Sequence, residues 1–557
     1  MHGKHLFSIL CCLVVSQTES FSQNSTIQNT ISKVWVSDLG NGKYKNPILN
    51  ADYSDPDAIR VGDDFYMIAS SFNHAPGLPL LHSKDLVNWT ILNHVLPRQK
   101  PYDVFNKVQH GNGVWAPAIR FHDKEFYIYY PDPDFGIYMT KTKDPKGEWS
   151  DPVLVFEGKG LIDPCPFWDE DGKNYLAFAY AGSRAGVKSV VALAKLNSTG
   201  DKVLDRGVIV YDGHELDPTI EGPKVYKRNG YYYLFSPAGG VSTGWQLVLR
   251  SKNIYGPYER KVVMDQGKTT VNGPHQGAWI DTQTGEDWFV HFQDKDAYGR
   301  VVHLQPMKWV NDWPVIGVDK NGKGVGEPVM EYKKPNVGKT YPIQTPAESD
   351  EFNSPILGKQ WQWQANPDGT WLMPGQQGAL RLYTMKVPES GKKLLDVSKN
   401  NLLDVPNILT QKFPAENFMA TAKIKLTGNE KIEQEMAGFA VVGEDYSHIY
   451  IKNGKQGQTL NFGVCKKGLT TGKESVSVLT SIKTNQYVYL RVKVTEGGKC
   501  NWFYSLDDRK YTAAGETFIA KPGKWIGATL GLYAIRDTQI NDSGYADVDW
   551  FRVEAVK

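Results

Sequence analysis

Five stretches of this chain begin with similar residues and follow one another at intervals of roughly fifty residues. They open at Asp55-Pro-Asp-Ala-Ile-Arg, Ala116-Pro-Ala-Ile-Arg-Phe, Asp163-Pro-Cys-Pro-Phe-Trp, Glu221-Gly-Pro-Lys-Val-Tyr and Pro274-His-Gln-Gly-Ala-Trp. A period of this length, built from strand, turn and strand, is typical of a radial repeat such as a β-propeller. We therefore predict a five-bladed β-propeller in which each unit forms one blade.

Each opening is followed by a polar turn and then by an aromatic strand, as in Gly62-Asp63-Asp64 and Phe65-Tyr66-Met67 of the first unit. Three of the five openings carry a carboxylate, namely Asp55, Asp163 and Glu221. Equivalent positions of successive blades face one central axis. These three carboxylates are therefore expected to converge, although they lie far apart in the chain.

A chain of 557 residues exceeds what one hydrophobic core usually organises, so two domains are expected. We predict a propeller over residues 30–340 and a second domain over residues 345–557. The break between them is the Pro- and Gly-containing segment from Lys333 to Lys339. Neither domain contains a long stretch with the periodicity of an amphipathic helix, so we predict that both are all-β.

The second domain loses the fifty-residue repeat but keeps short alternating strands. Its last strand, Ala546 to Phe551, is expected to pair beside the opening strand at Asp350, as the termini of jelly rolls do. The predicted fold is a concanavalin-like β-sandwich (jelly roll).

Residues 1–22 have the pattern of an export signal: Lys4 precedes the apolar run Leu6 to Val15, and Ser20-Phe21-Ser22 forms a small-x-small cleavage site. The apolar run is too short to span a bilayer, so no membrane insertion is expected. We expect an exported protein, periplasmic if the host is Gram-negative.

The amino-acid composition indicates which class of molecule this protein binds. A formal net charge of +2 without a run of Lys or Arg argues against nucleic acid as the main partner. A content of 16 Trp and 29 Tyr favours carbohydrate, whose rings stack on aromatic faces, although aromatic residues also fill β cores. After Cys11 and Cys12 of the signal, only Cys165, Cys465 and Cys500 remain, too few and too scattered for a disulfide framework or a zinc site. We expect single buried thiols, with a Cys465–Cys500 pair in the second domain as the alternative.

The three carboxylates suit the hydrolysis of an acetal. That reaction needs an acid that protonates the departing oxygen and a base that activates water on the opposite face. A third carboxylate nearby raises the pKa of the acid and keeps it protonated near neutral pH. The alternative is that Asp-Pro and Glu-Gly-Pro are ordinary turns. The recurrence of all three at one repeat position favours the catalytic interpretation.

Other candidates surround this set. His275 opens the fifth unit and is a metal ligand, a base or a hydrogen-bonded core residue. Arg300 is a partner for a carboxylate or a sugar hydroxyl, or a surface arginine. Trp115, Phe72 and, more weakly, His74 are candidate substrate-binding walls, with burial in the core as the alternative for each.

These motifs resemble those of glycoside hydrolase family 43, whose members include β-xylosidases and α-L-arabinofuranosidases. The resemblance implies that Asp55 is the general base, Glu221 the general acid, and Asp163 the residue that tunes the pKa of the acid and orients it. It also implies that Arg300 reaches the active site and that His275 approaches a structural calcium at the propeller axis through water. No cofactor is otherwise required.

One position departs from the family: Ala116 stands where many members carry Asp, which puts a second-blade carboxylate in doubt. The resemblance implies an exo-acting, inverting hydrolase that removes terminal α-L-arabinofuranosyl residues from plant cell-wall oligosaccharides such as xyloglucan or arabinoxylan. The alternatives are a β-D-xylosidase of the same family and a non-catalytic carbohydrate-binding propeller.

Overall fold

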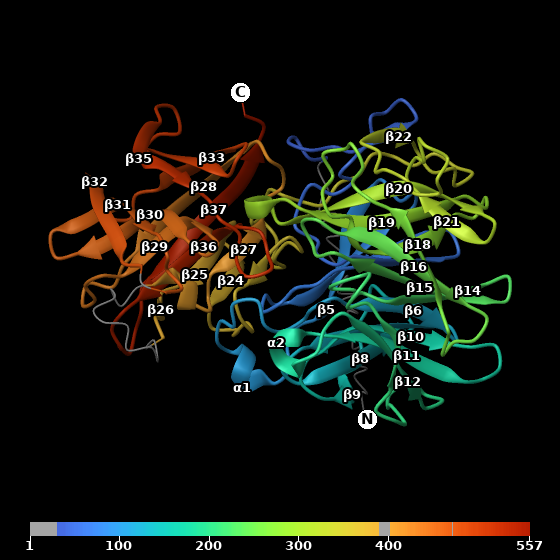
Figure 1. Cartoon of the computed structure of the whole chain (residues 1–557). Helices are drawn as coiled ribbons and strands as arrows, with labels where there is room; N and C mark the ends of the chain where they lie inside the picture. The colour runs from blue at the N-terminus through green and yellow to red at the C-terminus, as the bar shows by residue number, and fades with distance from the viewer. Residues whose placement is uncertain (1–30, 389–400, 471, 557) are drawn as a thin grey trace, which may run out of the picture.

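The computed structural model describes residues 31–388, 401–470 and 472–556, and the expected export signal lies outside these residues. The described chain is almost entirely β (Figure 1). Its helical elements are two single turns, α1 (Tyr102–Phe105) and α2 (Gly182–Ala185), and two 3₁₀ turns, η1 (Asp296–Tyr298) and η2 (Leu402–Asp404). Within the described ranges, no helix has both the length and the apolar character needed to cross a membrane.

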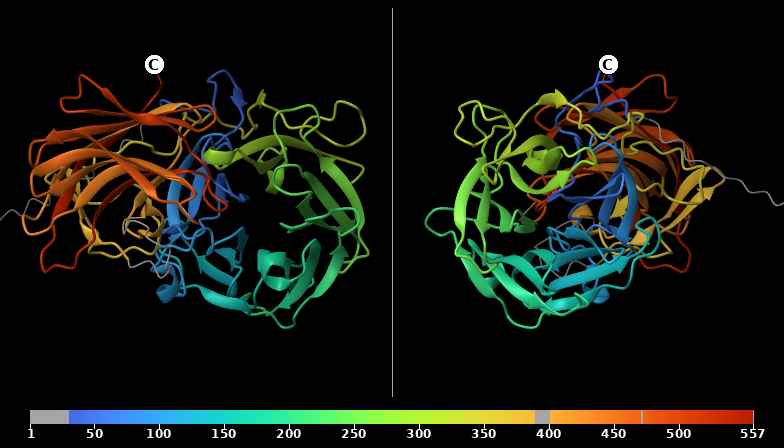
Figure 2. Two further views of the ribbon diagram at one scale, coloured as in Figure 1. Left: turned by 60° about the vertical axis from the view of Figure 1, so that its left-hand side comes forward. Right: turned by 90° about the vertical axis from the view of Figure 1, so that its right-hand side faces the viewer.

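Five four-stranded antiparallel sheets form the first domain, each made of strands consecutive in the chain. They are arranged in a ring beside the second domain (Figure 2). The predicted five-bladed propeller is therefore confirmed. The blades are β2 (Asp57–Val61), β3 (Asp64–Ile68), β4 (Gly77–Ser83) and β5 (Trp89–Leu96); β6 (Ala118–His122), β7 (Glu125–Asp132), β8 (Gly136–Thr142) and β9 (Val153–Glu157); β10 (Leu161–Trp168), β11 (Asn174–Tyr180), β12 (Val190–Leu196) and β13 (Val208–Asp212); β14 (Lys224–Arg228), β15 (Tyr231–Ala238), β16 (Trp245–Ser251) and β17 (Glu259–Met264); β18 (His275–Asp281), β19 (Asp287–Asp294), β20 (Arg300–Val310) and β21 (Trp313–Ile316).

The aromatic strand of each unit packs the blades against each other because its side chains alternate between the two faces of the sheet. In β3, Phe65 and Met67 join a core cluster with Trp288 of the fifth blade. Tyr66 and Ile68 point the other way, into a cluster with residues of the second blade such as Ile128. Alternation along one strand thus builds two inter-blade cores.

The ring is closed by residues that precede the first blade. The backbones of Leu49 and Val302, on β20, exchange two hydrogen bonds of 3.3 and 3.0 Å. Asn46 adds a side-chain hydrogen bond from Nδ2 to the carbonyl oxygen of Leu304 at 2.8 Å. The short strands β1 (Lys43–Lys45) and β22 (Glu331–Lys333) pair outside the ring. These contacts bring the start of the first unit next to the fifth blade.

The second domain is a sandwich of two sheets, antiparallel except where β26 pairs with β36, and their facing side chains form one continuous hydrophobic core. This confirms the predicted fold. One sheet contains β23 (Gln362–Trp363), β27 (Leu409–Lys412), β36 (Thr529–Arg536), β29 (Met436–Val442), β30 (Tyr446–Gly454), β31 (Gly457–Cys465) and β32 (Glu474–Ile482), with β26 (Met385–Lys386) beside β36; the other contains β24 (Leu372–Gln376), β25 (Ala379–Tyr383), β37 (Tyr545–Glu554), β28 (Phe418–Thr427), β33 (Val488–Thr495), β34 (Lys499–Ser505) and β35 (Thr512–Ile519).

Two further expectations are confirmed. Asp350 forms an antiparallel bridge with Phe551 on the last strand, with backbone hydrogen bonds of 2.7 and 2.8 Å. The cysteines of the described residues, Cys165 in the propeller and Cys465 and Cys500 in the sandwich, are buried free thiols.

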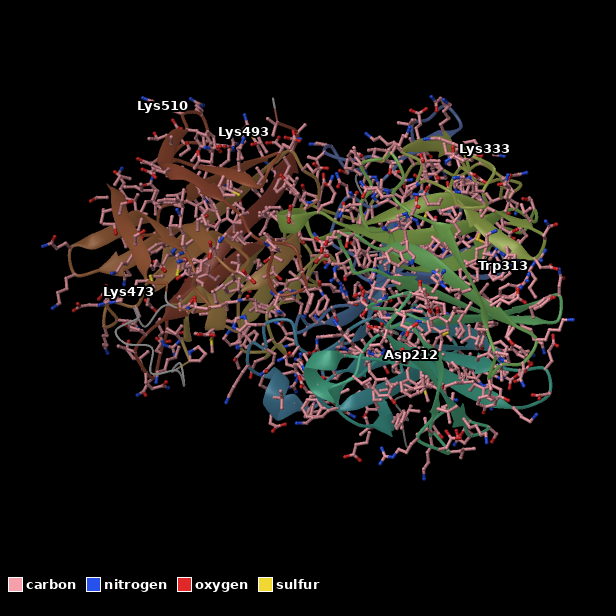
Figure 3. All side chains as sticks on the ribbon, viewed as in Figure 1. Asp212, Trp313, Lys333, Lys473, Lys493 and Lys510 are labelled. Carbon is pink, nitrogen blue, oxygen red and sulfur yellow. The ribbon has the colours of Figure 1, made fainter. Side chains whose placement is uncertain are left out.

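The two domains share an extensive contact in which side chains fill the space between the ribbons (Figure 3). Ala75 of the propeller and Trp363 of the sandwich exchange two backbone hydrogen bonds across it, at 3.0 and 2.5 Å. The hydroxyl of Tyr298 donates to the carbonyl oxygen of Thr495 at 2.8 Å. The sandwich is thereby fixed against the part of the ring where the first and fifth blades meet.

Candidate active site

Asp55, Asp163 and Glu221 come from the first, third and fourth blades and lie within electrostatic reach of one another. Burial, followed by the negative charges of Glu221 and Asp55, raises the pKa of Asp163 to about 8. Like charges act on one another in this way only at short range. The convergence predicted from the repeat is therefore present in the folded chain.

The backbone turns Asp55 and Asp163 out of their strands. Both have a left-handed backbone, with φ of 54° and 55°, which non-glycine residues seldom adopt. Asp163 also lies where the pairing of β10 and β11 shifts register between Ile162 and Cys165. Such bulges and strained residues cluster at functional sites because they re-aim a side chain.

Asp55 is held by three donors and is buried. Ser54 Oγ and Ser70 Oγ donate to its Oδ2 atom at 2.8 and 2.6 Å. Arg300 Nη1 lies 3.1 Å from Oδ1 and is its counter-ion. A carboxylate fixed by a guanidinium and two hydroxyls has one defined orientation, as a general base needs.

Glu221 is the most open of the three carboxylates, with 30% of its side chain exposed. His275 Nε2 lies 2.7 Å from its Oε1 atom. Beside it, the Gly222 N–H donates to Asp163 Oδ2 at 2.8 Å. The negative charge of Glu221 disfavours ionisation of the buried Asp163, so Asp163 keeps its proton in the neutral range.

The fifth blade connects the two ends of this arrangement. The Arg300 guanidinium, which pairs with Asp55, lies 4.8 Å from the ring centre of Phe292. Phe292 in turn contacts the His275 ring, with the centroids 5.6 Å apart. His275 then bonds to Glu221. A continuous chain of contacts thus runs from one candidate catalytic carboxylate to the other.

The surroundings of His275 do not form a site for a directly bound calcium ion. Its ring is fully buried, Nε2 is engaged by Glu221, and Nδ1 has no hydrogen-bond partner. Calcium takes six to eight oxygen ligands, mostly carboxylates and carbonyls. Within residues 31–388, 401–470 and 472–556, no group of three or more His, Cys, Asp or Glu side chains could hold a metal. These residues do not fit a directly bound calcium, and a calcium reached through water stays a prediction.

Trp115 lies at the rim of the site. It packs against Ile162, next to Asp163, and its ring lies 5.5 Å from the Arg184 guanidinium. The Phe72 backbone pairs with Val114, which places Phe72 beside Trp115, and its side chain is buried. Trp115 therefore lies near Asp163, and Phe72 lies behind it in the core.

His74 has different surroundings. It lines a cavity whose other residues include Leu403 of the sandwich and Lys524. Burial, followed by the charges of Lys412 and His110, lowers the pKa of His74 to about 3. This neutral imidazole thus lies in the contact between the domains.

Sequence analysis missed one aromatic residue of the site, because it comes from the sandwich. Trp525 lies 5.8 Å from the Arg300 guanidinium and makes an edge-to-face contact with Trp115 at 5.9 Å. Trp525 is 41% exposed as a residue, although its ring touches two residues of the other domain. The hydroxyls of Ser54 and Ser70 were also missed, and only the position of Ser54 beside Asp55 gave any signal.

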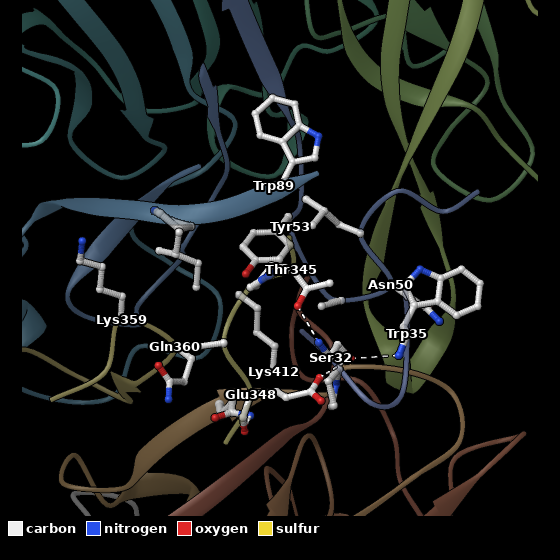
Figure 4. A pocket seen from close by; sticks show the side chains of 18 of the residues that line it. Ser32, Trp35, Asn50, Tyr53, Trp89, Thr345, Glu348, Lys359, Gln360 and Lys412 are labelled. Atoms are coloured by element: carbon white, nitrogen blue, oxygen red, sulfur yellow. Dashed lines mark hydrogen bonds between the residues drawn. The ribbon is translucent and has the colours of Figure 1, made fainter. Parts of the chain in front are cut away.

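A separate cavity lies between the first blade and the sandwich (Figure 4). Its lining includes Ser32, Tyr53, Glu348 and Lys412 and contains none of the three carboxylates. Its volume is about 60 Å³, whereas pockets for small-molecule ligands typically have about 300–1,000 Å³. It can hold a few water molecules and is not the substrate site.

Comparisons with known proteins identify both domains. The family model described as Glycosyl hydrolases family 43 matches residues 44–314. A second, described as Beta xylosidase C-terminal Concanavalin A-like domain, matches residues 349–554. Together they span the propeller and the sandwich.

Several relatives match nearly the whole chain, among them the following three. A putative beta-xylosidase of Xylanibacter ruminicola is 39% identical over 90% of this chain and 88% of its own. A beta-xylosidase of Formosa agariphila is 34% identical over 98% and 96%. A non-reducing end alpha-L-arabinofuranosidase of Bacteroides ovatus is 29% identical over 93% and 96%.

Among solved structures, a glycoside hydrolase family 43 protein of Bacillus licheniformis superposes with a TM-score of 0.76 at 25% identity. The match covers 92% of this chain and 100% of the other. Both domains and their arrangement are thus shared. Because both family models match and two relatives exceed 30% identity over most of their length, this chain belongs to glycoside hydrolase family 43.

Proposed function

We propose that this glycoside hydrolase is an exo-acting, inverting enzyme that releases terminal β-D-xylosyl residues from plant cell-wall hemicellulose. The observation that supports the proposal is that Asp55, Asp163 and Glu221, from three different blades, lie close enough for their charges to act on one another. The choice of xylose is supported by the names of the relatives that are 39% and 34% identical.

In the proposed reaction, Asp55 takes a proton from a water molecule whose oxygen attacks the anomeric carbon. Glu221 gives its proton to the glycosidic oxygen as the bond between that oxygen and the anomeric carbon breaks. Attack and departure occur on opposite faces of the sugar, so the configuration inverts. Glu221 regains a proton and Asp55 loses one to solvent before the next turnover.

The neighbours of each carboxylate support these roles. Arg300 and the hydroxyls of Ser54 and Ser70 hold Asp55 in one orientation. Asp163, with its raised pKa, lies against Gly222 and helps the acid keep its proton. His275 orients Glu221 through a 2.7 Å contact.

Aromatic walls support a site for a single terminal sugar. Trp115 and Trp525 meet edge to face at the rim, one from each domain. An apolar ring face offers a sugar a surface for stacking, and polar groups beneath it fix the sugar's orientation. Phe72 is proposed as a further wall.

α-L-arabinofuranose, predicted from sequence as the preferred sugar, is the second candidate. It is favoured by the relative from Bacteroides ovatus, whose name is that of an arabinofuranosidase and which is 29% identical. The two pentoses differ in ring size and in the position of the exocyclic carbon, so the shape of the pocket selects between them.

Release of nitrophenol from nitrophenyl β-D-xyloside and nitrophenyl α-L-arabinofuranoside tests the proposal. We expect the larger kcat/KM on the xyloside. A larger value on the arabinofuranoside would replace xylose by arabinose, and no release from either would favour a binding protein without turnover.

Export, with a periplasmic location in a Gram-negative host, also stays a proposal. Cell fractionation and N-terminal sequencing of the mature protein would test it. A chain found intact from Met1 in the cytoplasm would contradict it.

Dialysis against a calcium chelator tests the proposed axial calcium: an unchanged kcat and melting temperature would argue against it.

A further inference from the structure

One carboxylate outside the catalytic set, that of Asp52, binds backbone groups of both domains. Its Oδ1 atom accepts a hydrogen bond of 2.8 Å from the Arg300 N–H. Its Oδ2 atom accepts one of 3.0 Å from the N–H of Gly527, which belongs to the sandwich. Asp52 is buried, with 6% exposed, so these bonds form away from bulk water.

The two backbones around Asp52 approach as closely as glycine allows. A Cβ on Gly299 would lie 2.5 Å from the Cβ of Asp52, and the φ of Gly299 is 74°. A Cβ on Gly527 would lie 2.7 Å from the Gly299 nitrogen. The nearby Ala528 N–H donates to the Ala297 carbonyl oxygen at 2.8 Å. This three-residue junction (Asp52, Gly299 and Gly527) therefore has no room to shift.

Both residues held by Asp52 lead directly to the active site. The Arg300 side chain is the counter-ion of Asp55. Gly527 is two residues from Trp525, whose ring lies against the Arg300 guanidinium. The backbone carbonyl of Arg300 is held as well, by a 3.0 Å bond from the Tyr53 N–H.

We propose that Asp52 is a positioning residue that couples the sandwich to the catalytic base. By holding Arg300 and Gly527 together, it sets the Arg300 guanidinium against Asp55 and keeps Trp525 over the pocket. The inference rests on the proposed function, because it assigns Asp52 a role in that reaction through Arg300. Asp52 does not itself touch the sugar.

A carboxylate suits this position better than an amide of the same shape. Its two oxygens each accept one N–H, whereas the NH₂ group of asparagine would face one of those donors. Asp52→Asn thus keeps one hydrogen bond, and Asp52→Ala keeps neither. The buried N–H groups left without a partner would move apart or admit water.

Kinetics of Asp52 variants provide the first test. We expect Asp52→Ala to lower kcat/KM about 10- to 100-fold, since misplacement by about 1 Å can have such an effect. Asp52→Asn should fall between Asp52→Ala and the wild type. The loss should be equal for nitrophenyl and oligosaccharide substrates, because it acts through the base and not through the departing group.

A double-mutant cycle separates positioning from a purely structural role. If Asp52 acts through Arg300, adding Asp52→Ala to Arg300→Ala should lower kcat/KM little further. The matched control is Glu416→Gln, which removes another interdomain ion pair, with Lys295. This control should leave kcat/KM near wild type. A lowered melting temperature with unchanged kcat/KM in Asp52→Ala would overturn the proposal.

Hydrogen exchange tests the junction even if the wild type hydrolyses neither nitrophenyl substrate. In Asp52→Ala, the amides of Arg300 and Gly527 should exchange faster together, and Gly527→Ala should speed both as well. Faster exchange at only one amide, or at neither, would overturn the coupling. Absence of hydrolysis by a wild type that shows this joint protection would refute the proposed function alone.

Discussion

The N–H of Gly222 donates a 2.8 Å hydrogen bond to Oδ2 of Asp163, and so joins the residue after Glu221 to a carboxyl on the neighbouring blade. Burial and the charge of Glu221 raise the pKa of Asp163. One contact thus fixes the backbone of the candidate acid beside a carboxyl that resists ionisation next to Glu221. The division of roles among the carboxylates leads to separate predictions.

Glu221→Ala should depend on the departing group. With a xylo-oligosaccharide, kcat should fall about 10²- to 10⁴-fold, because the departing alkoxide needs a proton. With nitrophenyl xyloside the loss should be much smaller, because nitrophenolate departs without protonation. Steady-state kinetics on both substrates make the comparison, and an equal loss would argue against Glu221 as the acid.

Asp55→Asn should abolish turnover of both substrates. The asparagine keeps the shape of the side chain but cannot take a proton from water, so no departing group rescues it. Addition of azide, a small nucleophile, should restore part of the activity if the base is missing. Residual activity within about tenfold of wild type would exclude Asp55 as the base.

Asp163→Asn should change how stability depends on pH. The pKa of Asp163 lies at about 8 in the folded chain, against about 4 in an unfolded one. Its contribution to stability is therefore complete below about pH 4 and is lost as the pH rises to about 8.

Relative to wild type, Asp163→Asn should thus be more stable at pH 9 than at pH 5. The difference should be a few kcal/mol at most, since a tenfold change in proton affinity corresponds to about 1.4 kcal/mol. Denaturant unfolding of both proteins at the two pH values measures it. The same difference between them at pH 5 and pH 9 would show that Asp163 is not protonated in the fold. Activity should be lost at both pH values.

Trp525→Ala should raise KM more than it lowers kcat, if the ring contributes a wall for the sugar. We expect kcat/KM to fall about tenfold, corresponding to about 1.4 kcal/mol of lost contact. Trp525→Phe keeps an apolar ring and should retain most of the activity. If Trp525→Ala had the KM of the wild type, the sandwich would not contribute a wall to the sugar pocket through this residue.

The repeat predicted the propeller because blade geometry is local. The turn before Phe65-Tyr66-Met67 and the alternation of these side chains define a strand and its two faces, and no residue distant in the sequence is needed to predict them. The same regularity predicted that Asp55, Asp163 and Glu221 lie near one another, and their charges do act on one another in the fold. Sequence reasoning succeeded wherever a feature recurred in register.

It failed where a contact joins segments without a shared pattern. Trp525 reaches Arg300 because two domains dock, and neither local sequence records that docking. In the sequence, Asp52 looks like an ordinary loop carboxylate, and only the folded structure shows that it accepts a hydrogen bond from Gly527. His74 was grouped with Phe72 because they are near in sequence, yet its ring lines the domain contact.

The stereochemistry of the first product tests the central assignment most directly. Proton NMR during early turnover of a β-xyloside should show α-xylose appearing first, with the β anomer formed later by mutarotation, because water attacks opposite the departing oxygen. Initial formation of β-xylose would mean a retaining, double-displacement reaction, and would contradict Asp55 as a base acting through water.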